Sequence, residues 1–294
     1  MARITHVSNS INWIGHRGLS LHKYPENLIN SLEMAFQAGF DAETDFQPTR
    51  DKVLILYHDD FIPGTNDTEL NGGGFVHLDE SNKKPVSECT LAELHSRTRF
   101  DALKHERLLS KDAGRKVNLD VPSNPKIATL EELIVLMKKY PDRKVHLEIK
   151  RADEKKKYDD GLEETFVGML NDAGISDQVI VISFNEDSLK KTRTASSKIV
   201  LGADVWGKQA DDISEAKRMQ EQIGIKFWNP SFSDPGSQTR ITTQELVAAI
   251  KALGLDLAPW PWGETIESEA IQTDRMKSFG LTNIMINRGT AVLA

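Results

Sequence analysis

The sequence predicts an α/β protein of the TIM-barrel class, a (β/α)8 barrel that carries a small insertion. Short apolar, β-branched runs alternate with longer segments of helical periodicity, which is typical of β–α units around a parallel sheet. The length of 294 residues suits one domain of this class. The connection between two early strands is too short for a crossover helix, so these two strands should be antiparallel. One expected strand is therefore a hairpin arm, and eight parallel strands remain for the barrel.

Strands and helices are expected in regular alternation. The apolar runs mark nine strands, at 12–15, 40–45, 53–58, 144–149, 178–183, 198–203, 224–228, 255–259 and 283–286. Helical periodicity marks seven segments, at 27–38, 129–139, 160–173, 186–194, 211–222, 243–253 and 267–279. Thr129 and Glu132 have the spacing of a capping box, and Thr243 begins a later helix. Glycines that suit a left-handed cap follow three helices: Gly39, Gly174 and Gly254.

A hairpin and a long insertion interrupt this alternation. Asp51 and Lys52 lie at the turn between the strands at 40–45 and 53–58. Residues 60–128 contain several turn-forming pairs and a run of glycines, and within them only Leu91–Leu94 has a helical pattern. We therefore expect residues 1–294 to form a single barrel domain, with an inserted subdomain at about 60–128 on the face where loops carry specificity.

Charge and composition limit the partners and the location. Lys and Arg number 37 and Asp and Glu 44, and the net charge of −7 argues against a nucleic-acid partner. Cys89 is the only cysteine, which excludes an internal disulfide. No run approaches the roughly 18 apolar residues of a membrane span, and the first residues have no leader pattern. We expect a cytoplasmic protein, or a secreted one if a leader was removed. The oligomeric state stays open.

Two carboxylates suggest a metal site. Glu43 and Asp45 are two apart at the end of an expected strand, so both side chains leave the same face. Two inward carboxylates repel each other unless a cation or protons neutralise them. Oxygen ligands alone suit Mg²⁺ or Ca²⁺. The alternative is an exposed edge strand with both acids in water.

A histidine is expected beside this pair. His58 ends the next strand, and the hairpin places it roughly opposite Glu43 and Asp45. A histidine next to a metal site is typical of a proton shuttle. The alternative is a surface histidine.

A third strand adds polar side chains. His146, Glu148 and Lys150 alternate along 144–150 and share one face. Inside a barrel such groups must satisfy one another or bind something. Glu148 can supply a third carboxylate to the cation, and Lys150 can meet a phosphate oxygen. The alternative is an amphipathic strand with one wet face.

His16 and Arg17 complete the set, directly after the first strand and between Gly15 and Gly18. All these groups lie near the carboxyl ends of strands, where TIM-barrel active sites form. Two histidines, three carboxylates, an arginine and a lysine suit the metal-assisted cleavage of a phosphate ester. One histidine removes a proton, the other protonates the leaving alcohol, and Arg17 and Lys150 stabilise the transition-state charge.

The stretch from residue 16 to 60 closely resembles the start of the glycerophosphodiester phosphodiesterase family. The family motifs follow in order: His16-Arg17-Gly18, Pro25-Glu26-Asn27, Glu43 with Asp45, Thr49 with Asp51, and His58-Asp59. Later segments, TLEELI, LEIK and VISF, keep the family order, so the resemblance spans nearly the whole chain.

The resemblance implies a TIM barrel with an insertion after His58-Asp59. It implies a divalent cation, Ca²⁺ or Mg²⁺, on Glu43, Asp45 and Glu148. His16 and His58 would be the acid and base, with Arg17 and Lys150 near the phosphate. The implied substrates are glycerophosphodiesters such as glycerophosphocholine, and the products are sn-glycerol 3-phosphate and an alcohol. Which histidine is the base stays open, as does attack by water or through a cyclic phosphate.

The chain departs from the family pattern at two strand ends. Trp260-Pro261-Trp262-Gly263 replaces Trp-Thr-Val-Asn, and Ile286-Asn287-Arg288-Gly289 replaces a final Thr-Asp-x-Pro. We expect these changes to affect which organic group of a substrate is recognised, and to leave the metal site and the histidines untouched. Trp260 is a candidate substrate-pocket residue, with barrel packing as its alternative.

Two other functions stay open. A lysophospholipase D- or C-like enzyme would share this chemistry but needs an apolar lip. A non-catalytic barrel that binds a metabolite or a partner would explain the altered strand ends, but has no need of two facing histidines.

Overall fold

Strands and helices alternate along most of the chain. The computed structural model describes residues 11–19, 25–63, 75–78, 84–100, 125–207, 211–232, 243–261 and 266–287. Its strands are β1 (Asn12–Gly15), β2 (Asp41–Pro48), β3 (Leu54–Ile55), β4 (Phe75–His77), β5 (Thr98–Phe100), β6 (Val145–Ile149), β7 (Val179–Ser183), β8 (Val200–Val205), β9 (Phe227–Phe232), β10 (Trp260–Pro261) and β11 (Asn283–Ile286). Its α-helices are α1 (Ile29–Gln37), α2 (Leu91–Arg97), α4 (Leu130–Lys139), α5 (Leu162–Ala173), α6 (Glu186–Ala195), α7 (Ile213–Ile223), α8 (Gln244–Ala252) and α9 (Ile266–Ser278). Short 3-10 helices, η2 (Val86–Glu88) and η3 (Ser176–Gln178), precede α2 and β7.

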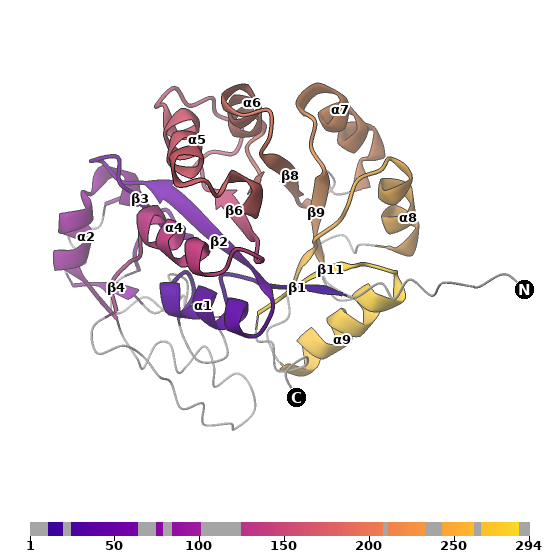
Figure 1. Ribbon diagram of the computed structural model, residues 1–294, viewed down its shortest axis with the longest axis horizontal. Helices are drawn as coiled ribbons and strands as arrows, with labels where there is room; N and C mark the ends of the chain where they lie inside the picture. Colours follow the sequence, from indigo (N-terminus) through magenta and orange to yellow (C-terminus); the bar gives the residue numbers. More distant parts are fainter. Residues whose placement is uncertain are drawn as a thin grey trace, which may run out of the picture.

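Parallel strands curl into a barrel, which confirms the predicted fold class. They are hydrogen-bonded in the order β10-β9-β8-β7-β6-β2-β1-β11. The two ends of this order, β10 and β11, contact each other, so the curled sheet meets itself. Helices α1 and α4 to α9 surround the strands (Figure 1). Because every strand in this order runs the same way, all their carboxyl ends lie on one face of the barrel.

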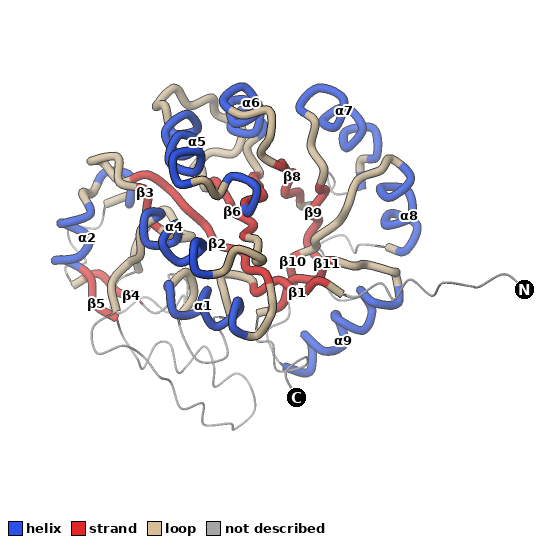
Figure 2. The backbone as a smooth tube through the Cα atoms, viewed as in Figure 1, coloured by secondary structure: helices blue, strands red, loops and turns tan. Residues whose placement is uncertain are grey.

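The predicted hairpin is confirmed. β3 pairs antiparallel with β2, with Gln47 opposite Ile55, and Lys52 has a φ of 62° in the turn. Beside the barrel, β4 and β5 form a separate two-stranded sheet next to α2 (Figure 2). The glycine run at 72–74 lies outside the described residues. The assignment of 60–128 as a subdomain of one domain stays a prediction.

Two apolar layers stabilise the barrel. The outer layer packs the strands against the helices, for example through Phe46 and Phe166, whose ring centroids are 5.1 Å apart. The inner cluster joins side chains from strands on different sides of the barrel: Ile14, Ile180, Ile182, Phe227, Ala258 and Met285. Such a cluster fills the interior and closes it below the carboxyl-end face. Of the helices that the structure describes, none has the length and apolar content that a membrane span requires.

The main differences from the expected boundaries lie in β9 and β10. The strand expected at 224–228 runs from Phe227 to Phe232, and the one expected at 255–259 pairs as a ladder only at 260–261. β9 carries the buried polar residues Asn229 and Ser231, and polar residues in a sequence suggest the end of a strand. The capping box at Thr129 is confirmed. The three cap glycines do have left-handed backbones: Gly39, Gly174 and Gly254.

Candidate active site

A cavity of about 430 Å³ opens at the carboxyl ends of the strands. It brings together seven of the eight site residues expected from the sequence: His16, Arg17, Glu43, His58, Glu148, Lys150 and Trp260. The eighth, Asp45, contacts two of them. Its Oδ2 lies 3.4 Å from Arg17 Nε and its Oδ1 3.3 Å from Lys150 Nζ.

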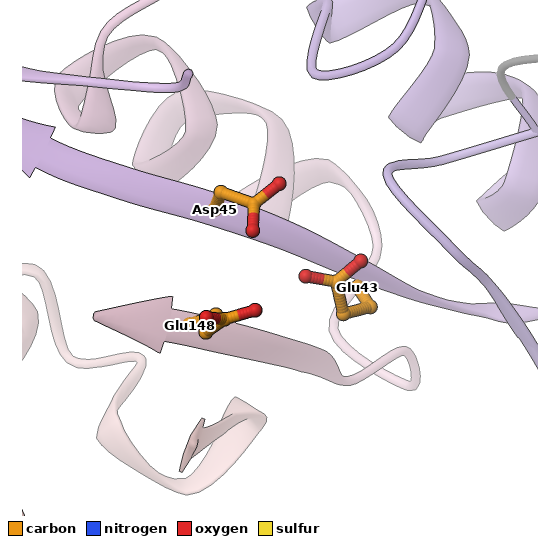
Figure 3. A group of neighbouring side chains, drawn as sticks. All are labelled: Glu43, Asp45 and Glu148. Atoms are coloured by element: carbon orange, nitrogen blue, oxygen red, sulfur yellow. The ribbon is translucent and has the colours of Figure 1, made fainter. Parts of the chain in front are cut away.

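The three acidic residues lie as a metal site requires. Glu43 and Asp45 lie on β2, and Glu148 faces Asp45 from β6. Their side chains point toward one another (Figure 3), and one oxygen of each lies within 4.8 Å of the others. All three are buried, which contradicts the alternative of an exposed edge strand. These carboxylates can hold a divalent cation.

The charges in this cluster are unbalanced, which favours a cation. Burial, together with the carboxylates of Asp45 and Glu148, raises the pKa of Glu43 well above its usual value. Glu43 Oε1 has no hydrogen-bond partner among the described residues. Burial and Asp45 raise the pKa of Glu148 to about 7, although Lys150 opposes this shift. A bound cation removes this repulsion by supplying positive charge where the three groups meet.

Asp45 behaves differently because cations flank it. Burial alone would raise its pKa, but Lys150, His58 and Arg17 hold that pKa well below the usual value. The Lys150 ammonium also lies 2.6 Å from Glu148 Oε1. Burial lowers the pKa of Lys150, but the carboxylates of Glu148 and Asp45 raise it by more, so the pKa of Lys150 lies above its usual value. Both cationic side chains in the cavity are thus charged.

The tight turn after β1 places Arg17 over β2. Its backbone has a φ of 55°, and its N–H donates to Glu43 Oε2 at 2.8 Å. The guanidinium Nη1 donates to both carboxylate oxygens of Glu26, at 3.0 and 3.1 Å. Gly18 ends the turn and donates its N–H to the carbonyl of Glu43. The turn therefore positions the Arg17 side chain beside Asp45 and also orients the carboxylate of Glu43.

Glu26 and Asn27 are supporting residues whose roles the sequence did not assign. Asn27 Nδ2 donates to Asp45 Oδ2 at 2.9 Å, and its Oδ1 accepts from Thr44 Oγ1 at 2.7 Å. The motif Pro25-Glu26-Asn27 was visible in the sequence, but its function follows only from these contacts. It orients Arg17 through Glu26 and Asp45 through Asn27.

Gly18→Ala should destabilise the protein more than Gly39→Ala. Both glycines have a left-handed φ, of 77° and 81°, and that backbone alone costs a non-glycine residue about 1–2 kcal/mol. A Cβ on Gly18 would also lie 2.5 Å from the Ser31 carbonyl carbon, whereas Gly39 has open space. Urea unfolding of both variants measures the difference. Equal losses of stability would contradict the close packing of this turn.

His16 is oriented by the end of the last strand. Its Nδ1 lies 2.6 Å from Asn287 Oδ1. Because an amide oxygen only accepts, Nδ1 carries the hydrogen and Nε2 keeps its lone pair. Nε2 lies 3.8 Å from Glu43 Oε2. Burial and the Arg17 charge lower the pKa of His16 to about 3, so the ring is neutral at pH 7.

The expectation that the altered strand ends leave the histidines untouched is wrong. Asn287, at one of these ends, contacts His16 directly. The sequence could not show this contact, because the barrel closes β1 against β11 across 271 positions of the chain. Of the other altered positions, Pro261 ends β10 and Ile286 ends β11, whereas Trp262, Gly263, Arg288 and Gly289 lie outside the described residues.

Asn287→Leu should lower kcat by about fivefold. The variant removes the acceptor for His16 Nδ1, a hydrogen bond of roughly 1 kcal/mol, and about 1.4 kcal/mol corresponds to tenfold in rate. Asn287→Asp keeps an acceptor and is the matched control. Steady-state kinetics with unchanged circular dichroism spectra provide the measurement. A leucine variant as fast as the wild type would show that this contact has no role.

His58 enters the cavity from the hairpin, as the sequence predicted. Its Nδ1 lies 2.6 Å from Asp59 Oδ1. Gln47 on β2 donates through Nε2 to the carbonyls of Tyr57 and Asp59, both at 2.9 Å, which fixes this segment. The carboxylate of Asp59 orients the His58 ring. Asp59 was visible in the sequence as part of the His58-Asp59 motif, but its orienting role follows from this contact.

His146 lies below the cavity. It is fully buried, and its ring edge contacts Phe227, with 5.5 Å between the centroids. Every residue of β6 is buried, so the alternative of a strand with one wet face is wrong. Burial and Lys144 lower the pKa of His146 to about 3, so it is a neutral core residue.

Trp260 lines the cavity from β10. Its ring meets Phe184 edge-on at 6.1 Å. It lines the cavity and also packs against the inner cluster, so the structure shows both the pocket position and the packing expected for it.

Comparison with known proteins identifies the family. The model of the glycerophosphoryl diester phosphodiesterase family matches residues 16–288. The chain belongs to this family. Glycerophosphodiester phosphodiesterases from Caldanaerobacter subterraneus and Bacillus subtilis are 29% and 28% identical to it. The first match covers 84% of each chain, and the second covers 93% of this chain and 82% of the relative.

Solved structures of phosphodiesterases have the same fold. One from Oleispira antarctica, in complex with the product sn-glycerol-3-phosphate, has a TM-score of 0.66 at 19% identity and covers 96% of this chain and 97% of that one. A glycerophosphodiester phosphodiesterase from Parabacteroides distasonis has a TM-score of 0.63 at 19% identity, with 95% and 94% covered. The resemblance found in the sequence is thus confirmed, and the chain is an enzyme, a glycerophosphodiester phosphodiesterase.

Proposed function

We propose that this enzyme hydrolyses glycerophosphodiesters to sn-glycerol 3-phosphate and an alcohol, with a divalent cation, Ca²⁺ or Mg²⁺, held by Glu43, Asp45 and Glu148. The observation that carries the proposal is the cavity that combines these acids with two histidines and two cationic side chains. Its volume falls in the ~300–1,000 Å³ range of small-molecule sites. The Oleispira relative binds the same product that we propose here.

The side chains divide the reaction between them. Asn287 accepts a hydrogen bond from His16 Nδ1, so Nε2 of His16 is unprotonated. This nitrogen accepts the proton of the attacking hydroxyl. His58, oriented by Asp59, gives a proton to the leaving alcohol as its bond to phosphorus breaks. Arg17 and Lys150 bind the non-bridging phosphate oxygens. The bound cation supplies positive charge that stabilises the phosphate in the transition state.

The attacking hydroxyl has two sources in this scheme. Water attacks phosphorus directly, or the glycerol 2-hydroxyl attacks and forms a cyclic phosphate that water opens in a second step. Both routes consume one water and release the same products. Quenching the reaction early and analysing the phosphates separates them, because only the second route produces the cyclic ester.

The test is the release of glycerol 3-phosphate from glycerophosphocholine, with EDTA and then with Ca²⁺ or Mg²⁺ restored. Release that depends on the cation supports the proposal. Faster cleavage of lysophosphatidylcholine, measured by its release of choline or phosphocholine, than of glycerophosphocholine would favour the lysophospholipase alternative instead. An absence of cleavage of both substrates with any cation would favour a barrel that only binds a metabolite or a partner.

A further inference from the structure

The cavity has two chemically different walls. The wall from β1, β2, β6 and the hairpin carries the charged groups described above. The second wall, from β7, β8, β10 and β11, is mainly apolar and consists of Ile182, Phe184, Asp204, Trp260 and Met285. The two walls meet where Lys150 Nζ lies 5.7 Å from the Phe184 ring centroid. Among the described residues of this second wall, Asp204 is the only titratable one. A lone carboxyl group on an apolar surface requires an explanation.

Asp204 is held rigidly, but its hydrogen bonding is incomplete. It is 3% exposed, and its Oδ1 accepts from Asn229 Nδ2 at 3.0 Å. Asn229 lies directly opposite it on β9, and its own Oδ1 accepts from the Ala258 N–H at 3.1 Å. The second oxygen, Asp204 Oδ2, is buried and has no partner in the described part of the chain. Buried polar atoms in proteins normally have a partner, so this oxygen indicates a ligand atom.

The packing below Asp204 protects this arrangement. Gly202 precedes Asp204 by two positions on β8 and therefore shares its face. A Cβ at residue 202 would lie 3.2 Å from Asn229 Nδ2 and 2.9 Å from Phe227 Cβ. A side chain there would press on the amide that holds Asp204. The strand is thus shaped to keep one oxygen fixed in position at the cavity wall.

The partner of this oxygen is neither the cation nor the phosphate. The acidic cluster that can hold a metal ion comprises Glu43, Asp45 and Glu148, without Asp204. Arg17 and Lys150 attract the phosphate to the wall that carries the charged groups. The polar groups of a glycerophosphodiester that remain are the hydroxyls of its glycerol half, which both donate and accept, and any polar group of its alcohol half. Burial and the charge of Glu148 also raise the pKa of Asp204 well above its usual value, so the carboxyl can donate as well.

The glycerol half and the alcohol half of the substrate can be assigned to two neighbouring cavities. A second cavity, of about 660 Å³, adjoins the first, and both are lined by His58, Glu148, Lys150, Phe184 and Trp260. His16 and Asp204 line only the first cavity. His58, which protonates the leaving alcohol in the proposed reaction, lines both cavities, whereas the base His16 lines only the first, so we place the alcohol in the second cavity. The glycerol half then stays beside His16 and Asp204.

We propose that Asp204 binds a hydroxyl group of the glycerol half of the substrate and so selects glycerol phosphodiesters over diesters of simpler alcohols. The proposal rests on the proposed function. Ile182, Phe184 and Met285 then contact the carbon atoms of the glycerol. A site built to bind a hydroxyl rejects an analogue that lacks it, because the buried oxygen is left unpaired.

Deoxy substrates test this assignment. The phosphocholine esters of 1,2-propanediol and 1,3-propanediol each lack one glycerol hydroxyl. The wild type should have a kcat/KM for glycerophosphocholine about 10–100-fold above that for at least one of them. Asp204→Leu should bring this ratio close to one, and Asp204→Asn, whose amide also hydrogen-bonds, should retain most of it. Asp256→Leu, at an exposed aspartate outside the cavity, is the control and should keep the wild-type ratio.

An Asp204→Leu ratio equal to the wild-type ratio would overturn the assignment and leave the proposed function intact. If the wild type releases no glycerol 3-phosphate from glycerophosphocholine with any cation, both proposals fail. Should the leucine variant not fold, calorimetry of the wild type compares glycerol 3-phosphate with the two propanediol phosphates. Equal affinities for all three would also overturn the role of Asp204, whereas weaker binding of one analogue supports it.

Discussion

His58→Ala is expected to lower kcat by about 10²–10⁴-fold, because removing a general acid or base typically has an effect of that size. The side chain is partly exposed at the cavity mouth, so its loss should barely change the stability of the fold. His95→Ala is the matched control, since His95 is a partly buried histidine on α2, outside the cavity. Glycerol 3-phosphate release by both variants, with thermal unfolding as the check on folding, gives the comparison.

A second substrate separates the roles of the two histidines. The 4-nitrophenyl ester of glycerol 3-phosphate has a leaving group that departs without a proton. If His58 is the acid, its alanine variant should lose much less activity on this ester than on glycerophosphocholine. His16→Ala should lose activity on both substrates, because a base is needed in either case. Wild-type rates in a folded His58→Ala protein would refute the assignment of His58, and an equal loss on both esters would assign it as the base.

Glu148→Gln is expected to have the other large effect, on cation binding. Removing one of three carboxylates should weaken Ca²⁺ or Mg²⁺ affinity by about 10–100-fold or more and lower activity in parallel at limiting cation. Glu131→Gln, on the exposed face of α4, is the control. Calorimetric titration measures the affinities. Identical affinity in Glu148→Gln and the wild type would remove Glu148 from the metal site.

The pH dependence gives a further check on the same residue. In the cation-free protein the pKa of Glu148 is raised to about 7, so the folded state holds a proton that the unfolded state has lost above its usual pKa. The stability of the cation-free protein should therefore fall as the pH rises from about 4.5 to 7. Glu148→Gln should abolish this part of the fall. A cation must displace the proton, so its affinity should drop as the pH falls below about 7.

Much of the chemistry could be predicted from local patterns. The two-residue spacing in a strand placed Glu43 and Asp45 on one face of their strand, and Glu148 and Lys150 on one face of theirs. The structure pairs these two strands, so the two faces lie side by side. The short turn at Lys52 predicted the hairpin that carries His58. The capping box at Thr129 marked the start of α4. These signals are readable because each depends on residues close together in the chain.

Other features depended on strand neighbours that are far apart in the chain. Asn287 contacts His16 because β11 lies beside β1 when the sheet closes. Asp204 forms its hydrogen bond to Asn229 because β8 and β9 are in register, and a buried aspartate within a strand has no distinguishing pattern in the sequence. The end of β9 was placed too early because its buried polar residues face the barrel interior rather than water.

The sequence by itself determined the class of fold, the family and the reactive groups, because periodicity and motif order are properties of the linear chain. Only the tertiary structure decided which oxygen orients each histidine, which carboxyl stands apart from the metal cluster, and which wall of the cavity is apolar. Those assignments depend on how the barrel closes, since closure places side chains from the first and last strands within hydrogen-bond distance.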